Sequence, residues 1–377
     1  DRPSTSSTLM TKSEPQAPGV DRPPSELTRI GVRALCEFTA RTGSLDHRFT
    51  PSPTSQQGTA GHAAVYARRG PDYQTEVFLS SKFRSLHVRG RADGYDSTRN
   101  RLEEIKTHRI DVHAIPDNHR ALHWAQAKIY AWMQCRTLGL SQIHVALVYY
   151  EIQSGRETIL SDLHEAQSLK VFFEQQCNRY LDWATAERLH RSERDATLET
   201  LSLPYPEFRA GQRELAAAVF NAHRRGCALL AQAPTGIGKS IGTLFPALSA
   251  ARSQRIDKIF YLTAKTSGRA ACLQASQQLK TANPALKLRT LELVSRESSC
   301  EYPDAKCHGE SCPLATGFFD RLPEARAKAS EQNILDASAL RQIAAEYRIC
   351  PYYLGLEMAR WCDLIVGDYN HYFNRTG

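Results

Sequence analysis

Residues 231–240 read Ala-Gln-Ala-Pro-Thr-Gly-Ile-Gly-Lys-Ser, and they decide the fold class of the second half of the chain. The apolar segment 227–233 has the length and composition of a buried parallel strand, and the segment after the loop can form a helix. Gly236 and Gly238 let the backbone turn its amides toward phosphate groups, Lys239 reaches the β- and γ-phosphates, and the next hydroxyl can ligate magnesium. A strand, a glycine-rich loop and a helix in this order predict a site for a nucleoside triphosphate.

The bulk composition bounds the classes of function. With 377 residues the chain is long enough for two or three domains of about 100 to 200 residues each. A formal net charge of +8 and a pI near 9.0 suit a polyanionic partner such as nucleic acid, with an ordinary solvated basic surface as the alternative. The longest apolar run, at 143–152, is far shorter than the roughly 20 residues of a membrane-spanning helix, so we expect no membrane partner.

The N-terminus and the cysteines indicate the compartment. The first ten residues (DRPSTSSTLM) lack the charged and then apolar layout of a signal peptide, which favours a cytoplasmic protein. Ten cysteines in a reducing compartment point to a metal or a cluster rather than to disulfides, at least for those that group in the sequence. The sequence opens at Asp1 without an initiator methionine, so we expect a fragment of a longer protein.

Composition and periodicity divide the chain. Residues 1–25 are rich in Ser, Thr and Pro, which predicts a disordered tail. Residues 26–190 form a first α/β domain, the charged and Pro-bearing residues 191–207 mark a linker, and residues 208–377 form a second domain with a parallel sheet. The expected helices are at 30–42, 119–138, 165–189, 211–225 and 267–280, and the expected strands at 75–80, 86–96, 101–108, 141–152, 157–161 and 258–266.

Two predicted strands of the first domain, joined by a tight turn, place two carboxylates together. With Thr98 and Arg99 at the centre of the turn, the numbers of paired residues sum to 197, which puts Asp93 directly opposite Glu104. Cross-strand partners lie about 5 Å apart on one face, and Lys106, two residues beyond, points to that same face. Two carboxylates and an amine on one face of a sheet suit a divalent ion.

This pattern resembles the PD-(D/E)XK nuclease superfamily, whose signature is an Asp after a Gly-containing strand and then Glu-x-Lys on the next strand. It is similar in particular to the RecB-like branch, which adds a histidine in a preceding helix, matched by GTAGH at 58–62, and a Gln-x-x-x-Tyr helix, matched at 126–130. The resemblance implies a Mg²⁺- or Mn²⁺-dependent nuclease in which Lys106 orients or activates the attacking water. The implied metal ligands are His62, Asp93, Glu104 and the Ile105 carbonyl, and the implied catalytic residues are Asp93, Glu104, Lys106, Gln126 and Tyr130. An inactive copy kept for DNA binding is the alternative.

Four cysteines group in a segment unlike the rest of the second domain, an insertion predicted at 296–352. They are Cys300, Cys307, Cys312 and Cys350. Four thiolates satisfy either a tetrahedral zinc ion or a [4Fe-4S] cluster, and spacing alone does not separate the two. The intervening six, four and 37 residues do not match the short paired spacings of zinc ribbons, which favours iron-sulfur. The others are expected to pack as small apolar side chains: Cys36, Cys135, Cys177, Cys227, Cys272 and Cys362.

The order of motifs in the second domain resembles the first motor domain of the XPD/DinG-type iron-sulfur helicases. It consists of a phosphate loop, a four-cysteine insertion whose last member opens Cys350-Pro-Tyr-Tyr, and DLIVGDYNH at 363–371. Residues 205–212 (YPEFRAGQ) resemble the entry motif in which a Gln recognises adenine, and 263–266 resemble a motif that contacts the DNA backbone. Ala233, where phosphate loops usually begin with Gly, is a common variant in superfamily 2 helicases. The implied ATP site consists of Gln212, Thr235, Gly236, Gly238, Lys239 and Ser240.

In that family an Asp-Glu-Ala-His box follows, and the chain stops at Gly377 before it. Asp368 ends an apolar strand but is followed by Tyr369, with no adjacent Glu to activate water, so we assign it no catalytic role. The second motor domain with its arginine fingers is also absent. We therefore expect this fragment to bind ATP, to hydrolyse it poorly and not to unwind DNA by itself.

The resulting hypothesis is an α/β protein in which a PD-(D/E)XK nuclease domain precedes an incomplete RecA-like motor domain with an iron-sulfur insertion. The predicted function is an ATP-dependent DNA helicase with a metal-dependent DNA nuclease, acting on single-stranded or forked DNA in repair or recombination. The predicted cofactors are ATP, Mg²⁺ or Mn²⁺, and a [4Fe-4S] cluster. One alternative is a helicase whose nuclease fold is an inactive DNA-binding module, and another is a zinc-stabilised nucleotide-binding scaffold without motor activity.

Overall fold

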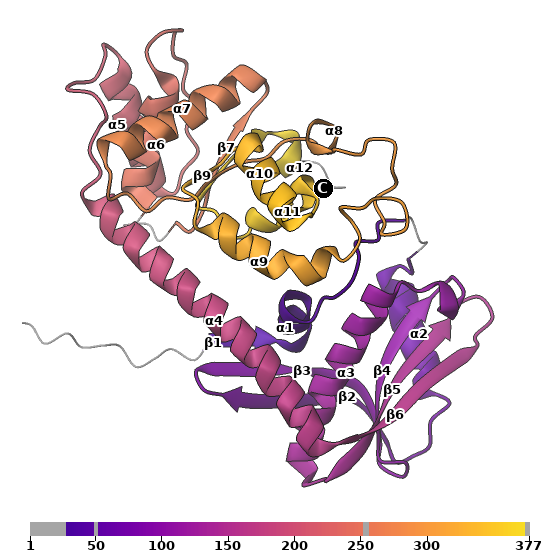
Figure 1. Cartoon of the computed structure of the whole chain (residues 1–377). Helices are drawn as coiled ribbons and strands as arrows, with labels where there is room; N and C mark the ends of the chain where they lie inside the picture. Colours follow the sequence, from indigo (N-terminus) through magenta and orange to yellow (C-terminus); the bar gives the residue numbers. More distant parts are fainter. Residues whose placement is uncertain (1–27, 49–51, 252–255, 374–377) are drawn as a thin grey trace, which may run out of the picture.

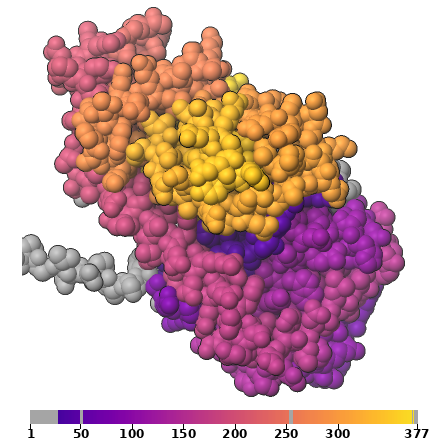
Figure 2. All heavy atoms as spheres, viewed as in Figure 1, coloured from indigo at the N-terminus to yellow at the C-terminus, as the bar shows by residue number. Residues whose placement is uncertain are grey.

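Two β-sheets, connected by the long helix α4 (Ala166–Glu199), organise the protein (Figure 1). The computed structural model describes residues 28–48, 52–251 and 256–373. The tail predicted at 1–25 lies outside the described residues. In the space-filling view the later part of the chain packs against the first part, with α4 running from one to the other (Figure 2).

The first sheet is mixed and has six strands, with β3 pairing to three others. β1 is parallel to β3, whereas β2 and β4 are antiparallel to it. β4 and β5 are parallel because the helix α3 returns the chain to the starting end of the sheet between them. The strands are β1 (Thr28–Gly31), β2 (Tyr73–Phe83), β3 (Leu86–Asp96), β4 (Arg101–His108), β5 (Gln142–Glu151) and β6 (Glu157–Glu165).

Helices cover both faces of this sheet. On one face α1 (Val32–Thr39), α3 (Asp117–Leu138) and α4 bury the large apolar core. On the other, α2 (Ser55–Tyr66) places Val65 against Ile105 and Val148 of the sheet. A short 3-10 helix (Val112–Ala114) precedes α3. Because α2 and α3 approach opposite faces close to β4, both can bring side chains to the edge where β3 and β4 meet.

The second sheet consists of four parallel strands in the order β7-β10-β8-β9. Its central strand alternates: Leu364 and Val366 face one core with α6 and α7, and Ile365 faces another with α9, α10 and α11. The strands are β7 (Ile259–Thr263), β8 (Thr290–Glu292), β9 (Ile334–Leu335) and β10 (Leu364–Asp368). The helices are α5 (Gln212–Arg225), α6 (Lys239–Ala251), α7 (Thr266–Ala282), α8 (Arg296–Ser299), α9 (Phe318–Ser330), α10 (Ala337–Tyr347), α11 (Pro351–Met358) and α12 (Asn370–Phe373).

The predicted α/β class, with parallel strands in the second half, is confirmed, and the strands predicted at 86–96 and 101–108 have the predicted bounds. Part of the segment predicted as an insertion at 296–352 belongs to the second sheet, because β9 pairs with β8. None of the helices in the described ranges is both long and apolar enough to cross a membrane.

The prediction of a strand at 227–233 is wrong. These residues have no regular structure, and the side chains of Leu229 and Leu230 are 44% and 102% exposed. Cys227, expected to be packed inside, is exposed as well, whereas the other five cysteines outside the group of four are buried. A strand needs a neighbour for its N–H and C=O groups, and no strand of the described residues pairs with this segment, although the outer edge of β7 is open.

The linker predicted at 191–207 begins later than expected. Helix α4 continues to Glu199, because its last turns are anchored rather than solvated. Arg194 and Leu198 are buried, Leu198 in the core beside α6 and α7. Arg194 donates to the Asp363 carboxylate at 2.9 Å, and His190 Nε2 lies 2.9 Å from the other oxygen of Asp363. The charges that suggested a linker therefore fix α4 to the second sheet.

The segment after α1 also joins the two parts. The N–H of Leu45 donates to the Ala315 carbonyl and that of His47 to the Cys307 carbonyl, each at 2.9 Å. The His47 ring stacks on Tyr353 with centroids 4.6 Å apart. The first part of the chain thus directly contacts the cysteine-bearing segment of the second.

Candidate metal centre and phosphate loop

The hairpin of β3 and β4 brings Asp93 to Glu104. The residue numbers of the pairs Gly94↔Glu103, Tyr95↔Leu102 and Asp96↔Arg101 have the predicted sum of 197. Continuing this register by one residue places Asp93 opposite Glu104. There the backbone ladder stops, and the Asp93 carboxylate itself accepts the Ile105 N–H at 2.6 Å. Asp93 is thereby held against β4 by its own side chain.

Lys106 lies on the same face as Glu104, two residues along β4. Its Nζ donates to Glu104 Oε1 at 2.6 Å and to Gln126 Oε1 of α3 at 3.3 Å. The side chain of Glu104 is only 6% exposed, and its second oxygen, Oε2, is buried without a hydrogen-bond partner. Because a buried, unpaired carboxylate oxygen is costly, this oxygen is available to a cation.

His62 approaches the edge where β3 and β4 meet from the opposite face, on α2. Thr54 and Gln57 form a capping box that begins this helix, and Gly61 lets it approach β4, because a Cβ there would lie 2.4 Å from the Thr107 methyl group. The His62 Nδ1 lies 3.6 Å from Asp93 Oδ1. The predicted histidine and the carboxylate pair therefore come together from three elements.

Tyr130, the last of the predicted catalytic residues, is buried beneath the hairpin. Its hydroxyl lies so close to β3 that a Cβ on Gly90 would be 2.5 Å away from it. Burial, followed by the charges of Glu104 and Asp93, raises the pKa of Tyr130, so the phenol stays protonated. Tyr130 is placed to support the strands that carry the carboxylates.

The electrostatics of this cluster suit a cation. Burial, and then the charge of Glu104, raises the pKa of Asp93 well above its usual value. Burial lowers the pKa of the Lys106 amine, but the negative charges of Glu104 and Asp93 outweigh burial, so the pKa is raised overall. Burial and the nearby Lys106 lower the pKa of His62, which keeps its imidazole neutral near pH 7 and able to act as a ligand. A divalent ion would relieve the repulsion between the two carboxylates.

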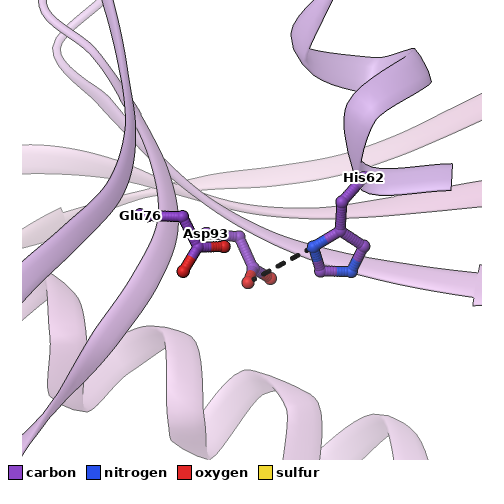
Figure 3. Close-up of side chains that lie close together, drawn as sticks. All are labelled: His62, Glu76 and Asp93. Atoms are coloured by element: carbon purple, nitrogen blue, oxygen red, sulfur yellow. Dashed lines mark ion pairs between the residues drawn. The ribbon is translucent and has the colours of Figure 1, made fainter. Parts of the chain in front are cut away.

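The structure adds a residue that the sequence interpretation missed. Glu76 of β2 lies with His62 and Asp93 so that one ligand atom from each falls within 4.8 Å of the others (Figure 3). A signal for it exists in the sequence. The strands β2 and β3 form a hairpin with Arg84 and Ser85 at its turn, and that register places Glu76 opposite Asp93.

In the second part, the phosphate loop adopts a turn that needs glycine. Gly236 and Gly238 have φ of +90° and +78°, in the left-handed region that side chains rarely adopt. The α6 helix begins at Lys239, whose Nζ donates to the carbonyls of Ala233 and Pro234 at 3.1 and 2.8 Å. The lysine thus closes over its own loop, while Thr235 at the tip is exposed and Ser240 lies in the first turn of α6.

Gln212, the predicted adenine contact, packs against this loop. It is buried, its Nε2 donates to the Gly238 carbonyl at 3.0 Å, and its Oε1 accepts the Arg209 N–H at 3.1 Å. Arg209 in turn donates to the Gly236 carbonyl at 2.8 Å. In this arrangement both polar ends of the Gln212 amide are used to hold the loop.

The four grouped cysteines are half-buried. Cys300 follows α8, and Cys350 is the N-cap of α11. Burial raises the pKa of the Cys350 thiol, and the neighbouring Cys300 and Cys312 raise it further. Cys307 hydrogen-bonds the Tyr353 side chain. A cavity of about 620 Å³ lies beside this group, lined among others by Cys300, Cys307, His47, Arg296 and Lys306.

Comparison with known proteins identifies the class of the second part. Residues 251–376 match the family model DEAD_2, a helicase-type domain. The match covers about a third of the chain and indicates a helicase-type domain in this part.

Two solved structures are similar over part of the chain. A truncated XPD is 19% identical, with a TM-score of 0.30, over 43% of this chain and 46% of its own. The crystal structure of SSO0001 is 18% identical, with a TM-score of 0.27, over 40% of this chain and 75% of its own. The match thus spans less than half of the truncated XPD. Comparison with curated proteins gave no match.

Proposed function

We propose that the protein is an ATP-dependent DNA helicase with an N-terminal metal-dependent DNA nuclease domain, acting in repair or recombination. The helicase part is supported by the DEAD_2 match together with a phosphate loop preceding it. The single observation that carries the nuclease part is the convergence of His62, Asp93, Glu104 and Lys106 from α2, β3 and β4 at the edge where β3 and β4 meet. The proposed boundaries are 26–190 for the nuclease domain and 208–377 for the motor domain.

The residues of the proposed nuclease site have separate roles. The donor set of two carboxylates, a neutral imidazole and the Ile105 carbonyl suits Mg²⁺ or Mn²⁺, and the orphaned Oε2 of Glu104 is one open ligand position. A bound ion would supply positive charge at the scissile phosphate and a hydroxide near neutral pH. Lys106, fixed between Glu104 and Gln126, would orient the attacking water. The proposed catalytic set is Asp93, Glu104, Lys106, Gln126 and Tyr130.

Cleavage of labelled single-stranded and forked DNA by the 377-residue chain with Mn²⁺ or Mg²⁺ tests this proposal. We expect Asp93→Ala and Lys106→Ala each to lower the rate by at least about 100-fold, as removal of a proton-transfer or metal-activating group does. Lys170→Ala is the matched control, because that lysine is exposed and its ion pair among the described residues is with Glu174, also at the surface. DNA binding without metal-dependent cleavage in the wild type would instead identify an inactive DNA-binding module.

For the motor, we propose that Gln212, Thr235, Gly236, Gly238, Lys239 and Ser240 bind ATP. The positive φ of both glycines and the position of Lys239 at the start of α6 support this assignment. Lys239→Ala is expected to abolish binding of a fluorescent ATP analogue. Unchanged binding by this variant would reject the assignment.

For the four cysteines, we propose ligation of a [4Fe-4S] cluster by Cys300, Cys307, Cys312 and Cys350. A single tetrahedral zinc ion, with Zn–S bonds of about 2.3 Å, needs its sulfur atoms about 3.8 Å apart. Within the described residues, no three of these thiols lie within 4.8 Å of one another. The intervening six, four and 37 residues, unlike the short paired spacings of zinc ribbons, favour the larger cluster. Iron analysis and absorbance in the visible range test it, and stoichiometric zinc without iron would support a zinc-stabilised scaffold instead.

A further inference from the structure

The hairpin of β2 and β3 has one face in the core and one face open to solvent. Leu79 and Val88 point into the large core on the side of α1, α3 and α4. On the other side, α2 packs on Ile105 and Val148 of β4 and β5, and in Figure 1 the turn of the hairpin points away from α2. Because side chains alternate along a strand, the residues between those of the core form an exposed surface, here called the hairpin face. It consists of Phe78, Ser80, Lys82, Arg89 and Arg91.

The charge of this surface is positive. Residues 77–92 include four lysines or arginines and no aspartate or glutamate. Strand β1 adds the exposed Arg29, which lies beside His87 in the parallel register while its neighbour Ile30 is buried in the core. A surface of cations without interspersed carboxylates attracts a polyanion rather than a mixed protein surface. The hairpin face therefore suits the phosphate backbone of a nucleic acid.

The hairpin face leads directly to the candidate metal centre. Arg91 lies two residues before Asp93 on β3, and its Nη1 is 4.0 Å from Glu76 Oε2. Glu76 in turn has a ligand atom within 4.8 Å of those of His62 and Asp93. Arg89 follows Arg91 by two residues, a step of about 7 Å along the strand. A strand of nucleic acid that contacts both arginines would thus have its next phosphates at the metal centre.

One aromatic ring stands among these cations. Phe78 is 63% exposed and is the cross-strand partner of Arg91, two residues from Glu76. A ring beside a guanidinium offers a stacking surface for a base and a cation for its phosphate, which is the combination that binds single-stranded nucleic acid. In a duplex each base is already stacked between its neighbours, so the Phe78 ring has no free base to contact. The pair of Phe78 and Arg91 therefore favours an unpaired strand.

We propose that the hairpin face binds the single-stranded DNA that enters the metal centre, with Phe78 stacking on a base and Arg89 and Arg91 contacting phosphates. This inference rests on the proposed nuclease function and deepens it, because it assigns the preference for an unpaired strand to a named side chain. Phe78 touches none of the proposed metal ligands in this arrangement. Its role is to select and hold the substrate.

Photocrosslinking of the 377-residue chain to DNA that carries an iodouracil base tests the proposal, with EDTA present so that no strand is cut. Mass spectrometry should locate an adduct on Phe78 with the single strand, and at least about fivefold less of it with a duplex of the same sequence. Arg89→Ala combined with Arg91→Ala should lower the yield at least about fivefold, and the wild-type yield should fall as salt is added. Lys170→Ala, which removes an exposed cation on α4, is the matched control and should leave the yield unchanged.

The kinetics of cleavage with Mn²⁺ give a second measurement. Phe78→Ala should raise KM for a single-stranded oligonucleotide at least about fivefold and leave kcat within about twofold, because the ring binds substrate without touching the reacting atoms. Cleavage of a duplex should not change. Because the side chain is 63% exposed, the variant should fold, and Phe78→Trp, which keeps a stacking surface, should retain the wild-type KM.

The outcomes separate this inference from the nuclease proposal. Cleavage that depends on Asp93, with no adduct on Phe78 and an unchanged KM in Phe78→Ala, would overturn the role of the hairpin face and leave the nuclease proposal standing. Equal adducts with the single strand and the duplex would overturn the preference for an unpaired strand. An adduct on Phe78 without metal-dependent cleavage would support the hairpin face as a binding surface for single-stranded DNA and would overturn the nuclease proposal.

Discussion

The face that carries Asp93 and the loop that carries Lys239 are supported in different ways. Asp93, Glu104 and Lys106 lie on strands that are paired with neighbours, and each of these side chains is fixed by a hydrogen bond. The phosphate loop follows a segment without ladder partners and is held by Gln212, Arg209 and its own lysine. A site built on paired strands is organised before a ligand arrives, whereas the loop depends on a few side-chain contacts.

The largest effect should come from the buried charges beneath the first sheet. Glu103 is fully buried and accepts hydrogen bonds from Arg69, Tyr73 and Arg101. Glu103→Gln removes the counter-charge of the largely buried Arg101 and one of the two carboxylates that pair with Arg69, so we expect the free energy of unfolding to fall by about 3 to 5 kcal/mol in a urea titration. Glu174→Gln, which removes a surface partner of Lys170, should cost less than about 0.5 kcal/mol. Equal effects of the two variants would mean that buried charge does not hold this sheet.

Asp363 is the corresponding buried charge beside the second sheet, and its removal should cost about 3 kcal/mol. It accepts from Arg194, from the Arg289 N–H and from His190. Burial alone raises the pKa of a carboxyl, but these partners outweigh it and hold the pKa of Asp363 below 3.8. A carboxyl whose pKa is lower in the folded than in the unfolded protein stabilises the fold fully at pH values above its unfolded-state pKa. This stabilisation is lost as the pH falls through the folded-state pKa.

Unfolding measured from pH 6 down to pH 2.5 tests this assignment. Below about pH 3.8, the usual carboxyl pKa, the wild-type protein should lose the contribution of Asp363 to its free energy of unfolding. The free energy of unfolding of Asp363→Asn should fall less over the same pH range. The same acid dependence in both proteins would show that the joint between α4 and the second sheet does not depend on this charge.

A smaller and more local effect is expected in the phosphate loop. Gly238→Ala places a Cβ at φ +78°, 2.4 Å from the Gln212 Nε2. The backbone strain is about 1 to 3 kcal/mol. If Gln212 moves away to relieve it, the loop loses the hydrogen bonds of Gln212, so the affinity for a fluorescent ATP analogue should fall about tenfold. Gly70→Ala is the matched control, since no atom lies within 4 Å of its added Cβ and its φ is not positive. Unchanged affinity in Gly238→Ala would show that the loop tolerates a different shape.

The features that could be predicted from the sequence are those that depend on residues close to one another along the chain. The tight turn at 97–100 sets the register that places Asp93 opposite Glu104. The two-residue period of a strand then places Lys106 on the same face as Glu104. Glu76 was missed because its hairpin register was not carried across β3. The predictions of the C-terminal end of α4 and of a strand at 227–233 were wrong for another reason. Whether Arg194 finds Asp363, or an apolar segment finds a partner strand, depends on residues far away in the chain.

The smallest effect should come from the segment before the loop. Leu230 is fully exposed, so Leu230→Ala removes no buried area and should change the free energy of unfolding by less than about 0.5 kcal/mol. Leu364→Ala on the central strand β10 is the comparison, because burial there is complete and such truncations cost about 2 to 5 kcal/mol. A cost of more than about 1 kcal/mol for Leu230→Ala would mean that this segment is buried in solution, most simply as a strand on the open edge of β7. The phosphate loop would then be as well supported as the face that carries Asp93, and the contrast between the two sites would disappear.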